Sequence, residues 1–418
     1  MKKPSLLVIF LTVFIDLIGF GIVLPLLPLY SQKYGAGALM IGAVMASFSL
    51  MQFLFAPWWG GLSDRIGRKP VLLVSTAGSA VSYAVFALAS RFEPSMALWV
   101  VLFSRVIAGI CGANITVAQA CIADVSPLQE RTKKMGLIGM AFGLGFIFGP
   151  ALGGKSLIWF GEAGPGWVAA GLCAANLILA LAVLPETRKP GGVPAARRPG
   201  WSAWPRVLAR SKVGLLVGVF FLATLGFSCF ETSLGLLVAA NFGLDPARAR
   251  DAETVAILFT FCGIVGALAQ GGPVGKLAKK WGEPKMIGIS LLLFAAGMGS
   301  IPFVRGAGNF SWSGLFQTGG GPWLMLLLSL ALLSIGSGLT RPPIFGMISK
   351  LTPVDEQGET LGVAQSAGSL ARIAGPILAM ALFKFHPPAP YVLAAILAVI
   401  AGGVAWVKLS EPSRSGES

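Results

Sequence analysis

The sequence is poor in charge. Asp, Glu, Lys and Arg make up only 12% of its 418 residues, compared with roughly 25% in an average soluble domain. Hydrophobic residues make up 55%, and the mean hydropathy is +0.78. This composition is typical of an integral membrane protein. The apolar runs are about 20 residues long, as in transmembrane helices, and no alternating pattern indicates a transmembrane barrel.

Histidine and cysteine are also scarce. The single histidine, His386, lies in a loop, and the five cysteines lie in apolar runs without the paired spacing of a metal site or a disulfide framework. We therefore predict no metal and no cofactor. An intramembrane protease or lipid transferase would need a histidine dyad, a metal cluster or paired aspartates, so an enzyme is not expected. The sequence has no glycine-rich phosphate loop, which argues against ATP as the energy source.

Acidic residues number 17 against 32 basic ones, which gives a net charge of +15. The basic residues are spread over short loops rather than gathered on one face, so topology explains them better than nucleic-acid binding does. One set of alternate loops, together with both termini, holds about 22 Lys and Arg, and the other set holds about seven. The positive-inside rule predicts a multi-pass protein of the inner (plasma) membrane with both termini cytoplasmic.

Twelve apolar runs predict an all-α integral membrane fold. They lie at about 5–29, 38–59, 70–90, 96–119, 134–154, 166–184, 212–240, 254–273, 285–303, 323–347, 359–383 and 389–409. The stretch between the sixth and seventh runs is rich in proline and basic residues. The predicted domains are therefore an N-terminal six-helix half at 1–184, a cytoplasmic linker at 185–211 and a C-terminal six-helix half at 212–418.

The two halves repeat each other. An offset of 215 residues takes Asp16 to Glu231, and one of 226 takes Gly149 and Pro150 to Gly375 and Pro376. Secondary transporters contain internal repeats of this kind, with the site near the bilayer midplane.

Few charged residues fall inside the apolar runs, and these are predicted to be functional. At the centre of a helix each would cost about 2.5–3.5 kcal/mol facing lipid, so each should face a cavity or a partner. The alternative for any one of them is a buried ion pair that only joins helices. The set is Asp16, Arg105, Glu231, Arg341 and Arg372.

Asp16 and Glu231 are predicted to couple transport to protons. Burial raises the pKa of a carboxyl group and a nearby arginine lowers it, so such a group can bind a proton in one conformation and release it in another. Two acids favour a cationic or zwitterionic substrate, whereas Arg105 and Arg372 leave an organic anion as the alternative.

Polar and aromatic residues of the same runs are predicted to line a substrate cavity. Gly109, Gly112, Thr116 and Gln119 follow Arg105 at helical spacing and predict one polar face. The alternative is that the amides satisfy backbone groups and the phenylalanines only pack. The predicted cavity set is Phe20, Gln52, Asn114, Thr116, Gln119, Phe227, Phe230, Gln270, Arg341, Gln365 and Arg372.

Four segments resemble signatures of the major facilitator superfamily, and in particular of its twelve-helix drug:proton antiporters near the tetracycline-efflux type. They are the charged, glycine-marked loop Gly61–Lys69, the first run from Asp16 to Pro28, Arg105–Gly109, and Gly143–Gly154. The resemblance implies two pseudo-symmetric six-helix halves and proton-coupled export of an amphipathic organic solute or drug by alternating access. It also implies a monomer in the lipid bilayer whose partners are protons and a small-molecule substrate. Proton symport is a further possibility, against which the Gly143–Gly154 signature argues.

The resemblance also assigns roles to residues. It links Arg105 with proton transfer, and it places Asp64 against the start of the eleventh helix, near Glu359 to Gly362, with Arg68 paired to Asp124. The bland alternative is a solvated hairpin whose basic residues only set topology. The predicted conformational gate is Gly61, Asp64, Arg65, Gly67, Arg68, Lys69 and Asp124. The second half has Lys279 and Glu283 at the repeat positions of Asp64 and Arg68, so no equivalent second gate is expected.

Small residues and prolines mark the fifth and eleventh runs. Glycines let a neighbouring helix approach closely, and proline bends a helix by removing a backbone hydrogen bond. The alternative is ordinary packing of small residues. The predicted bend set is Gly145, Gly149, Pro150, Gly153, Gly375 and Pro376.

Overall fold

A computed structural model describes residues 6–112, 114–188, 201–244, 249–315 and 320–410 of the chain. Within these ranges the regular structure is helical and no strand occurs. Twelve helical spans are long and apolar enough to cross a membrane, which confirms the predicted all-α fold.

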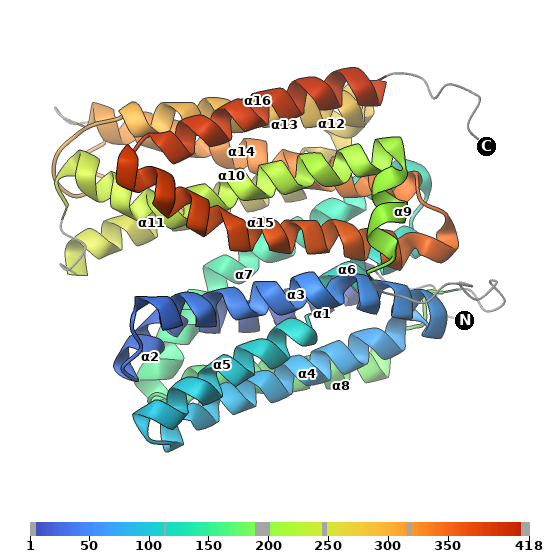
Figure 1. The fold of residues 1–418 in the computed structure, drawn as a ribbon, viewed down its shortest axis with the longest axis horizontal. Helices are drawn as coiled ribbons and strands as arrows, with labels where there is room; N and C mark the ends of the chain where they lie inside the picture. Colours follow the sequence, from blue (N-terminus) through green and yellow to red (C-terminus); the bar gives the residue numbers. More distant parts are fainter. Residues whose placement is uncertain (1–5, 113, 189–200, 245–248, 316–319, 411–418) are drawn as a thin grey trace. The chain divides into compact units, whose positions relative to one another are not determined.

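The spans follow the chain in the order that the sequence predicts (Figure 1). The first six are α1 (Leu6–Val23) with η1 (Leu24–Leu26) and α2 (Leu27–Lys33), α3 (Ala38–Ile66), α4 (Arg68–Leu88), α5 (Pro94–Ile110) with α6 (Asn114–Val125), α7 (Arg131–Phe160) and α8 (Gly164–Val183). The last six are α10 (Ser211–Phe242), α11 (Ala249–Gly271) followed by α12 (Val274–Trp281), α13 (Glu283–Ser300), α14 (Gly321–Lys350), α15 (Gln357–Phe385) and α16 (Ala389–Ser410).

Two of the predicted runs are interrupted. The first changes to a 3-10 turn at Pro25, because proline lacks the N–H group that a continuous helix requires. The fourth run breaks between Ile110 and Asn114. The carbonyl oxygens of Ile110 and Cys111 next to this break accept hydrogen bonds from the side chains of Trp59 and Ser75.

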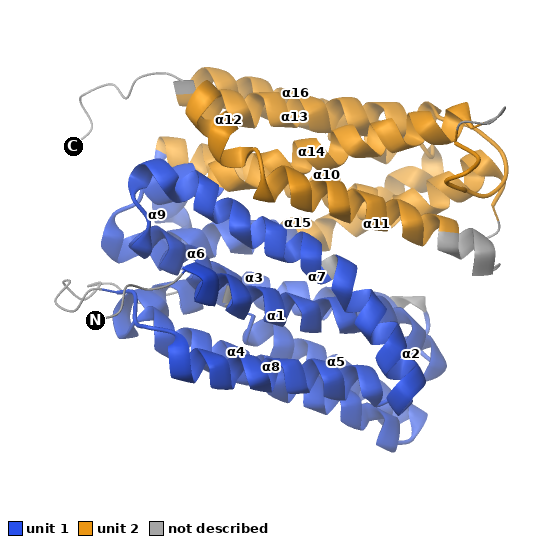
Figure 2. Cartoon of the chain, turned by 180° about the vertical axis from the view of Figure 1, so that it is seen from behind, with its two compact units in different colours: residues 1–210, 345–370 blue, residues 211–344, 371–418 orange. Residues whose placement is uncertain are grey.

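The chain divides into two compact units (Figure 2). Unit 1 contains residues 1–210 and 345–370, and unit 2 contains 211–344 and 371–418. Unit 1 therefore includes the end of α14 and the first half of α15 as well as the predicted N-terminal half. The predicted linker at 185–211 includes a short helix, α9 (Ala203–Ala209), which belongs to unit 1.

Glycines let α1 and α7 pack closely against each other in unit 1. A Cβ atom added to Gly149 would lie 2.5 Å from the carbonyl carbon of Gly21, and one added to Gly21 would lie 2.5 Å from the carbonyl oxygen of Gly145. A Cβ on Gly153 would lie 2.9 Å from the carbonyl oxygen of Ile22. The close helix approach predicted for these glycines is thus present, because only a residue without Cβ lets two backbones come so near.

Unit 2 repeats this contact between α10 and α15. A Cβ on Gly375 would lie 2.6 Å from the Cβ of Ser228, and the thiol of Cys229 donates a hydrogen bond to the carbonyl oxygen of Gly375 at 3.4 Å. Pro150 and Pro376 both lie inside continuous helices.

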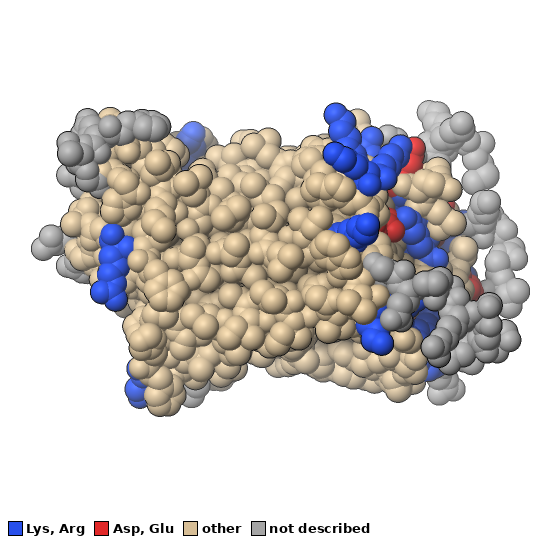
Figure 3. Space-filling model, turned by 90° about the horizontal axis from the view of Figure 1, so that it is seen from above, with Lys and Arg blue, Asp and Glu red and all other residues tan. Residues whose placement is uncertain are grey.

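Charged side chains lie mainly at helix ends. On the face shown in Figure 3, Lys and Arg gather toward the two ends of the long helices, and the described residues of the wide band between them show no charge. This distribution suits helices whose middle sections face hydrocarbon.

Candidate functional site

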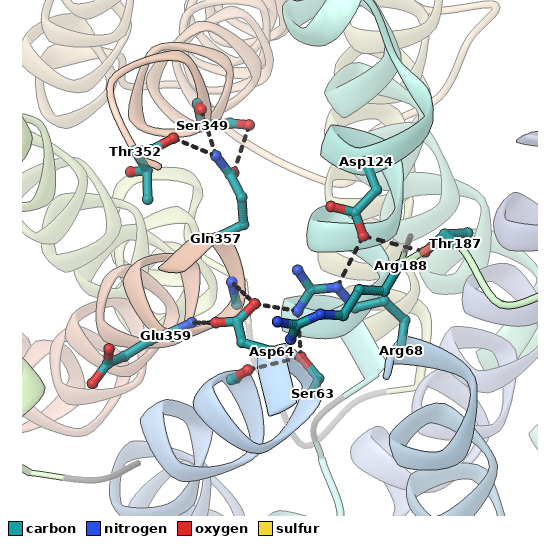
Figure 4. Close-up of polar contacts among 12 residues, drawn as sticks. Ser63, Asp64, Arg68, Asp124, Thr187, Arg188, Ser349, Thr352, Gln357 and Glu359 are labelled. Carbon is teal, nitrogen blue, oxygen red and sulfur yellow. Dashed lines mark hydrogen bonds and ion pairs between the residues drawn. The ribbon is translucent and has the colours of Figure 1, made fainter. Parts of the chain in front are cut away.

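The loop between the second and third spans holds the start of α15. Asp64, in the last turn of α3, accepts hydrogen bonds from the backbone N–H groups of Gly358 and Glu359 at 2.9 and 2.8 Å (Figure 4). The first turn of a helix has free N–H groups and the positive end of the helix dipole, so a carboxylate binds well there. The contact predicted for Asp64 is confirmed.

Arg68 completes this buried cluster. Its guanidinium contacts the carboxylate of Asp64 at 2.5 Å and that of Asp124 at 3.0 Å, and it donates a hydrogen bond to the Ser63 hydroxyl at 2.7 Å (Figure 4). Asp64 and Arg68 are each only 1% exposed. Buried charges are stable only when they are paired and hydrogen-bonded in this way. The predicted pairing of Arg68 with Asp124 is present.

Gly67 allows the turn between α3 and α4. Its φ angle of 102° lies in a region that L residues with a side chain rarely adopt. The other predicted gate residues are more peripheral: Gly61 lies within α3, Arg65 is exposed, and the Lys69 ammonium donates to the carbonyl oxygen of Leu181 at 3.2 Å.

Glu186 is a member of the cluster that the sequence analysis missed. Its carboxylate accepts the N–H groups of Arg68 and Lys69, at 2.9 and 3.1 Å, and so caps the start of α4. The next residue, Thr187, donates its hydroxyl to Asp124 at 3.2 Å. An acidic residue directly after an apolar run was the available signal, but only the fold brings it to the N-terminus of α4.

The linker helix α9 also binds the start of α15. Arg206 forms an ion pair with Glu359 at 2.7 Å, and Arg210 forms one with Glu356. The rings of Trp201 and Trp204 lie 5.0 and 5.9 Å from the ring of Phe53 on α3. The N-terminal turn of α15 is therefore held by the loop cluster and by the segment that the sequence predicts as a linker.

Gln357, the first residue of α15, binds the turn between α14 and α15. Its amide nitrogen donates to the carbonyl oxygens of Ser349 and Thr352 at 2.8 and 2.7 Å (Figure 4). Arg131, at the start of α7, also donates to the Ser349 carbonyl at 2.7 Å. These bonds fix the turn between α14 and α15 inside unit 1.

The intramembrane charges of unit 1 lie among α1, α4, α5 and α8. The thiol of Cys173 is 3.6 Å from a carboxylate oxygen of Asp16, and the guanidinium of Arg105 interacts with the hydroxyl of Tyr83. Arg105 is 2% exposed and lies 4.9 Å from the ring centre of Phe48 and 5.9 Å from that of Phe20. An arginine over aromatic rings gains cation–π energy in such a place.

The intramembrane charges of unit 2 form a second group. Arg372 acts electrostatically on both Glu231 and Arg341, and Arg341 lies 5.6 Å from the ring centre of Phe220. Glu231 lies in the middle of α10, yet its side chain is exposed.

For the remaining predicted cavity residues, the contacts help to distinguish a substrate cavity from backbone hydrogen bonding and ordinary packing. Gln52 donates to the Gly112 carbonyl at 3.3 Å and accepts from Ser369 at 2.8 Å, so it does satisfy backbone. Phe230 is 1% exposed and packs 5.7 Å from Phe227. Thr116, Gln119 and Gln365 are buried and Gln270 is half-buried, whereas the side chain of Asn114 lies outside the described residues.

The predicted polar face of the fourth run is not continuous. It assumed one helix from Arg105 to Gln119, but the break after Ile110 places these residues on α5 and α6. Arg105, Gly109 and Gly112 nevertheless all lie next to α3: Arg105 is close to the ring of Phe48, a Cβ on Gly109 would lie 2.5 Å from the carbonyl oxygen of Phe48, and one on Gly112 would lie 3.4 Å from the side chain of Gln52. A shared face that continues to Thr116 and Gln119 on α6 stays a prediction.

Twelve membrane-length helices from two sequence-related halves, with acids and arginines inside the spans, define a secondary transporter. The chain belongs to the Major Facilitator Superfamily, whose family model matches residues 9–321 and 272–418. This confirms the resemblance drawn from the four segments. The protein is thus a multi-pass membrane transporter.

Two curated relatives and one solved structure can be aligned with nearly all of the chain. It is 32% identical to the tetracycline resistance protein, class E, of Escherichia coli, over 89% of this chain and 86% of that protein. It is 26% identical to the quinolone resistance protein NorA of Staphylococcus aureus, over 99% and 98%. A crystal structure of the human organic anion transporter MFSD10 (TETRAN) matches with a TM-score of 0.79 and 25% identity, over 96% of this chain and 98% of that chain.

Proposed function

We propose that this protein exports an amphipathic cationic or zwitterionic drug of the tetracycline or quinolone kind, in exchange for protons that bind Asp16 and Glu231. The observation that carries the proposal is a carboxyl group in the first helix of each sequence repeat, with polar or cationic groups beside it. Asp16 has Cys173 and Tyr83 near it, and Glu231 has Arg372. The curated relatives, which are tetracycline and quinolone resistance proteins, support this substrate class.

The chemistry requires an acid that releases its proton when drug binds. A buried carboxyl group holds a proton until a cation or an arginine approaches and stabilises its charged form. Drug and proton then compete for the same acids, and this competition couples the two fluxes in opposite directions. Arg105 and Arg372 stabilise the ionised acids in this scheme, and Phe20, Phe227 and Phe230 supply apolar contact for the drug.

The Asp64 cluster acts in this proposal as the cytoplasmic gate. Its hydrogen bonds to the start of α15 hold the outward-facing state closed toward the cytoplasm, and they break when the transporter reopens to the inside. Both termini and α9 lie on the cytoplasmic side, and the protein works as a monomer in the bilayer. Lys279 at the repeat position of Asp64 supports a single gate rather than two.

An organic anion is the second candidate substrate. Unit 2 contains two arginines that interact electrostatically with each other, Arg341 and Arg372, and Arg372 also interacts with Glu231. Such a group would attract a carboxylate or sulfonate. The structural relative, a human organic anion transporter, supports this alternative.

Substrate-triggered proton release tests both candidates. Purified full-length protein in weakly buffered detergent receives tetracycline, a quinolone or an organic anion, and released protons are followed with a pH dye. We expect release by tetracycline or the quinolone in wild type and in Glu162→Gln, a control at an exposed ion pair. Release should be lost in Asp16→Asn and reduced in Glu231→Gln.

A different result would favour an organic anion as the substrate. Binding of the anion alone, without proton release and with at least tenfold weaker binding in Arg372→Ala, would replace the drug-export proposal with organic-anion transport. In vesicles, an uncoupler should abolish drug accumulation if a proton gradient drives export.

A further inference from the structure

Tyr83 of α4 interacts with an intramembrane acid and an intramembrane arginine of unit 1. It is only 5% exposed, and its hydroxyl interacts with the guanidinium of Arg105. The carboxylate of Asp16 also acts electrostatically on this hydroxyl. Tyrosine is rare in this sequence, with four in 418 residues, and nothing in the sequence analysis assigned this one a role.

Gly19 makes room for the tyrosine ring against α1. A Cβ atom added to Gly19 would lie 3.1 Å from Cε2 and 3.6 Å from Cζ of Tyr83, and 3.4 Å from the thiol sulfur of Cys173. Gly19 is one turn after Asp16, so the phenol lies directly beside the part of α1 that carries the acid. Asn176 of α8 fixes the same part of α1 through a 2.8 Å hydrogen bond from its amide to the carbonyl oxygen of Thr12.

We propose that Tyr83 is a positioning residue for proton exchange, which holds Arg105 in place and uses its own O–H group to stabilise the ionised form of Asp16. The inference rests on the proposed function, because it concerns the proton that Asp16 carries. Near Asp16 in unit 1, Cys173 comes from α8 and Tyr83 from α4, and Arg105 of α5 interacts with the Tyr83 hydroxyl. The face of α7 against α1 contributes Gly145 and Gly149.

A phenol suits this position because it is both an acceptor and a donor. Its oxygen accepts from the guanidinium, which has no acceptor capacity, and its proton remains available for a carboxylate. A hydrogen bond to the charged form of an acid favours that form, so the phenol lowers the affinity of the acid for its proton. The thiol of Cys173, at 3.6 Å, is a much weaker donor.

Infrared titration of the Asp16 carboxyl group tests the proposal without any drug. The band of the protonated acid is followed against pH in purified full-length protein, and it is assigned to Asp16 by its loss in Asp16→Asn. In Tyr83→Phe we expect the midpoint of this band to move to higher pH by about one pH unit, the effect of losing one hydrogen bond to a charged group. Gly19→Ala, which must displace the ring, should move the midpoint in the same direction.

Two control variants separate this role from general loosening of the helices. Cys173→Ala removes the thiol beside Asp16, and Tyr34→Phe removes a phenol hydroxyl that has no hydrogen-bond partner among the described residues. Both should leave the midpoint within about 0.3 pH units of wild type, well under the shift for one hydrogen bond. A midpoint that is unchanged in both Tyr83→Phe and Gly19→Ala, or that shifts equally in the controls, would overturn the proposal.

The two proposals fail in different ways. If the Asp16 band shifts in Tyr83→Phe while neither tetracycline nor the quinolone releases protons, the positioning role stands and drug–proton exchange fails. If the drugs release protons from wild type while Tyr83→Phe leaves the band in place, drug–proton exchange stands and the positioning role fails.

Discussion

At the scale of single residues, the protein stabilises buried charge by surrounding it with hydrogen-bond partners. Asp64 has two backbone N–H groups and Arg68, and Arg68 has two carboxylates and the Ser63 hydroxyl. Buried charges are stable only when they are paired and hydrogen-bonded in this way, so Asp64 and Arg68 stabilise the arrangement that the structure shows.

Asp64→Asn should destabilise the protein strongly, because it leaves buried Arg68 with only one of its two carboxylates and weakens the cap of α15. We expect a loss of about 3–5 kcal/mol in the free energy of unfolding, measured by denaturant titration in micelles. Glu162→Gln is the matched control, since it breaks the Lys33–Glu162 ion pair, whose side chains are 57% and 41% exposed. That change should cost no more than about 1 kcal/mol, and equal losses in the two variants would contradict the argument.

At the scale of helices, close packing and end contacts fix the arrangement of unit 1. α1 packs mainly on α7 and α8, and α4 packs on α8. Between α1 and α7 the contact is backbone to backbone, because Gly21 of α1 faces Gly145 and Gly149 of α7. We call this contact the glycine seam. The start of α15 is held differently, by the capping carboxylate of Asp64 and the arginines of α9. Such polar contacts can break and re-form more readily than a packed glycine seam, as a gate requires.

Gly149→Ala tests the glycine seam. The new methyl group would lie 2.5 Å from the Gly21 backbone, so α1 and α7 must move apart. We expect a loss of about 1–3 kcal/mol of stability, seen as a lower midpoint of thermal unfolding in detergent. Gly154→Ala on the same helix should leave the midpoint nearly unchanged, because a Cβ there has no atom of the described residues within 4 Å. Similar shifts in both variants would show that the seam has no special role.

At the scale of the whole molecule, the distribution of charge predicts how the chain lies across the membrane. The excess of basic residues in alternate loops and at both termini predicts that this side is cytoplasmic. α9, between the sixth and seventh spans, lies on the predicted cytoplasmic side, and Arg91, between the third and fourth, lies on the opposite side. Only the charge asymmetry distinguishes these two sides.

Labelling with a membrane-impermeant maleimide tests this orientation. We expect Arg91→Cys to be labelled in intact cells and Ser202→Cys only after permeabilisation, because both positions are exposed and lie on opposite sides in the prediction. Background from the native thiols should be low, since Cys121, Cys173, Cys229 and Cys262 are buried and Cys111 lies within the fourth span. The reverse pattern would invert the topology.

The sequence by itself predicted the twelve spans, the repeat and the family. Hydrocarbon requires runs of about 20 apolar residues, so spans are visible without any tertiary information. Charges inside those runs identified Asp16, Arg105, Glu231, Arg341 and Arg372, because each is costly in lipid. The contacts of Asp64 and Arg68 came from the resemblance rather than from spacing.

Only the tertiary structure decided which side chains meet across distant segments. Three contacts illustrate this: Glu186 with the N-terminus of α4, Arg206 with α15, and Tyr83 with α1. These residues are separated from their partners by dozens to hundreds of residues, and no local pattern shows which groups they meet. The break after Ile110 also escaped prediction, because the side chains of Trp59 and Ser75 bind the carbonyl groups that a continuous helix would have used. Hydropathy and periodicity report the solvent that each residue faces, whereas specific hydrogen bonds depend on how the helices pack.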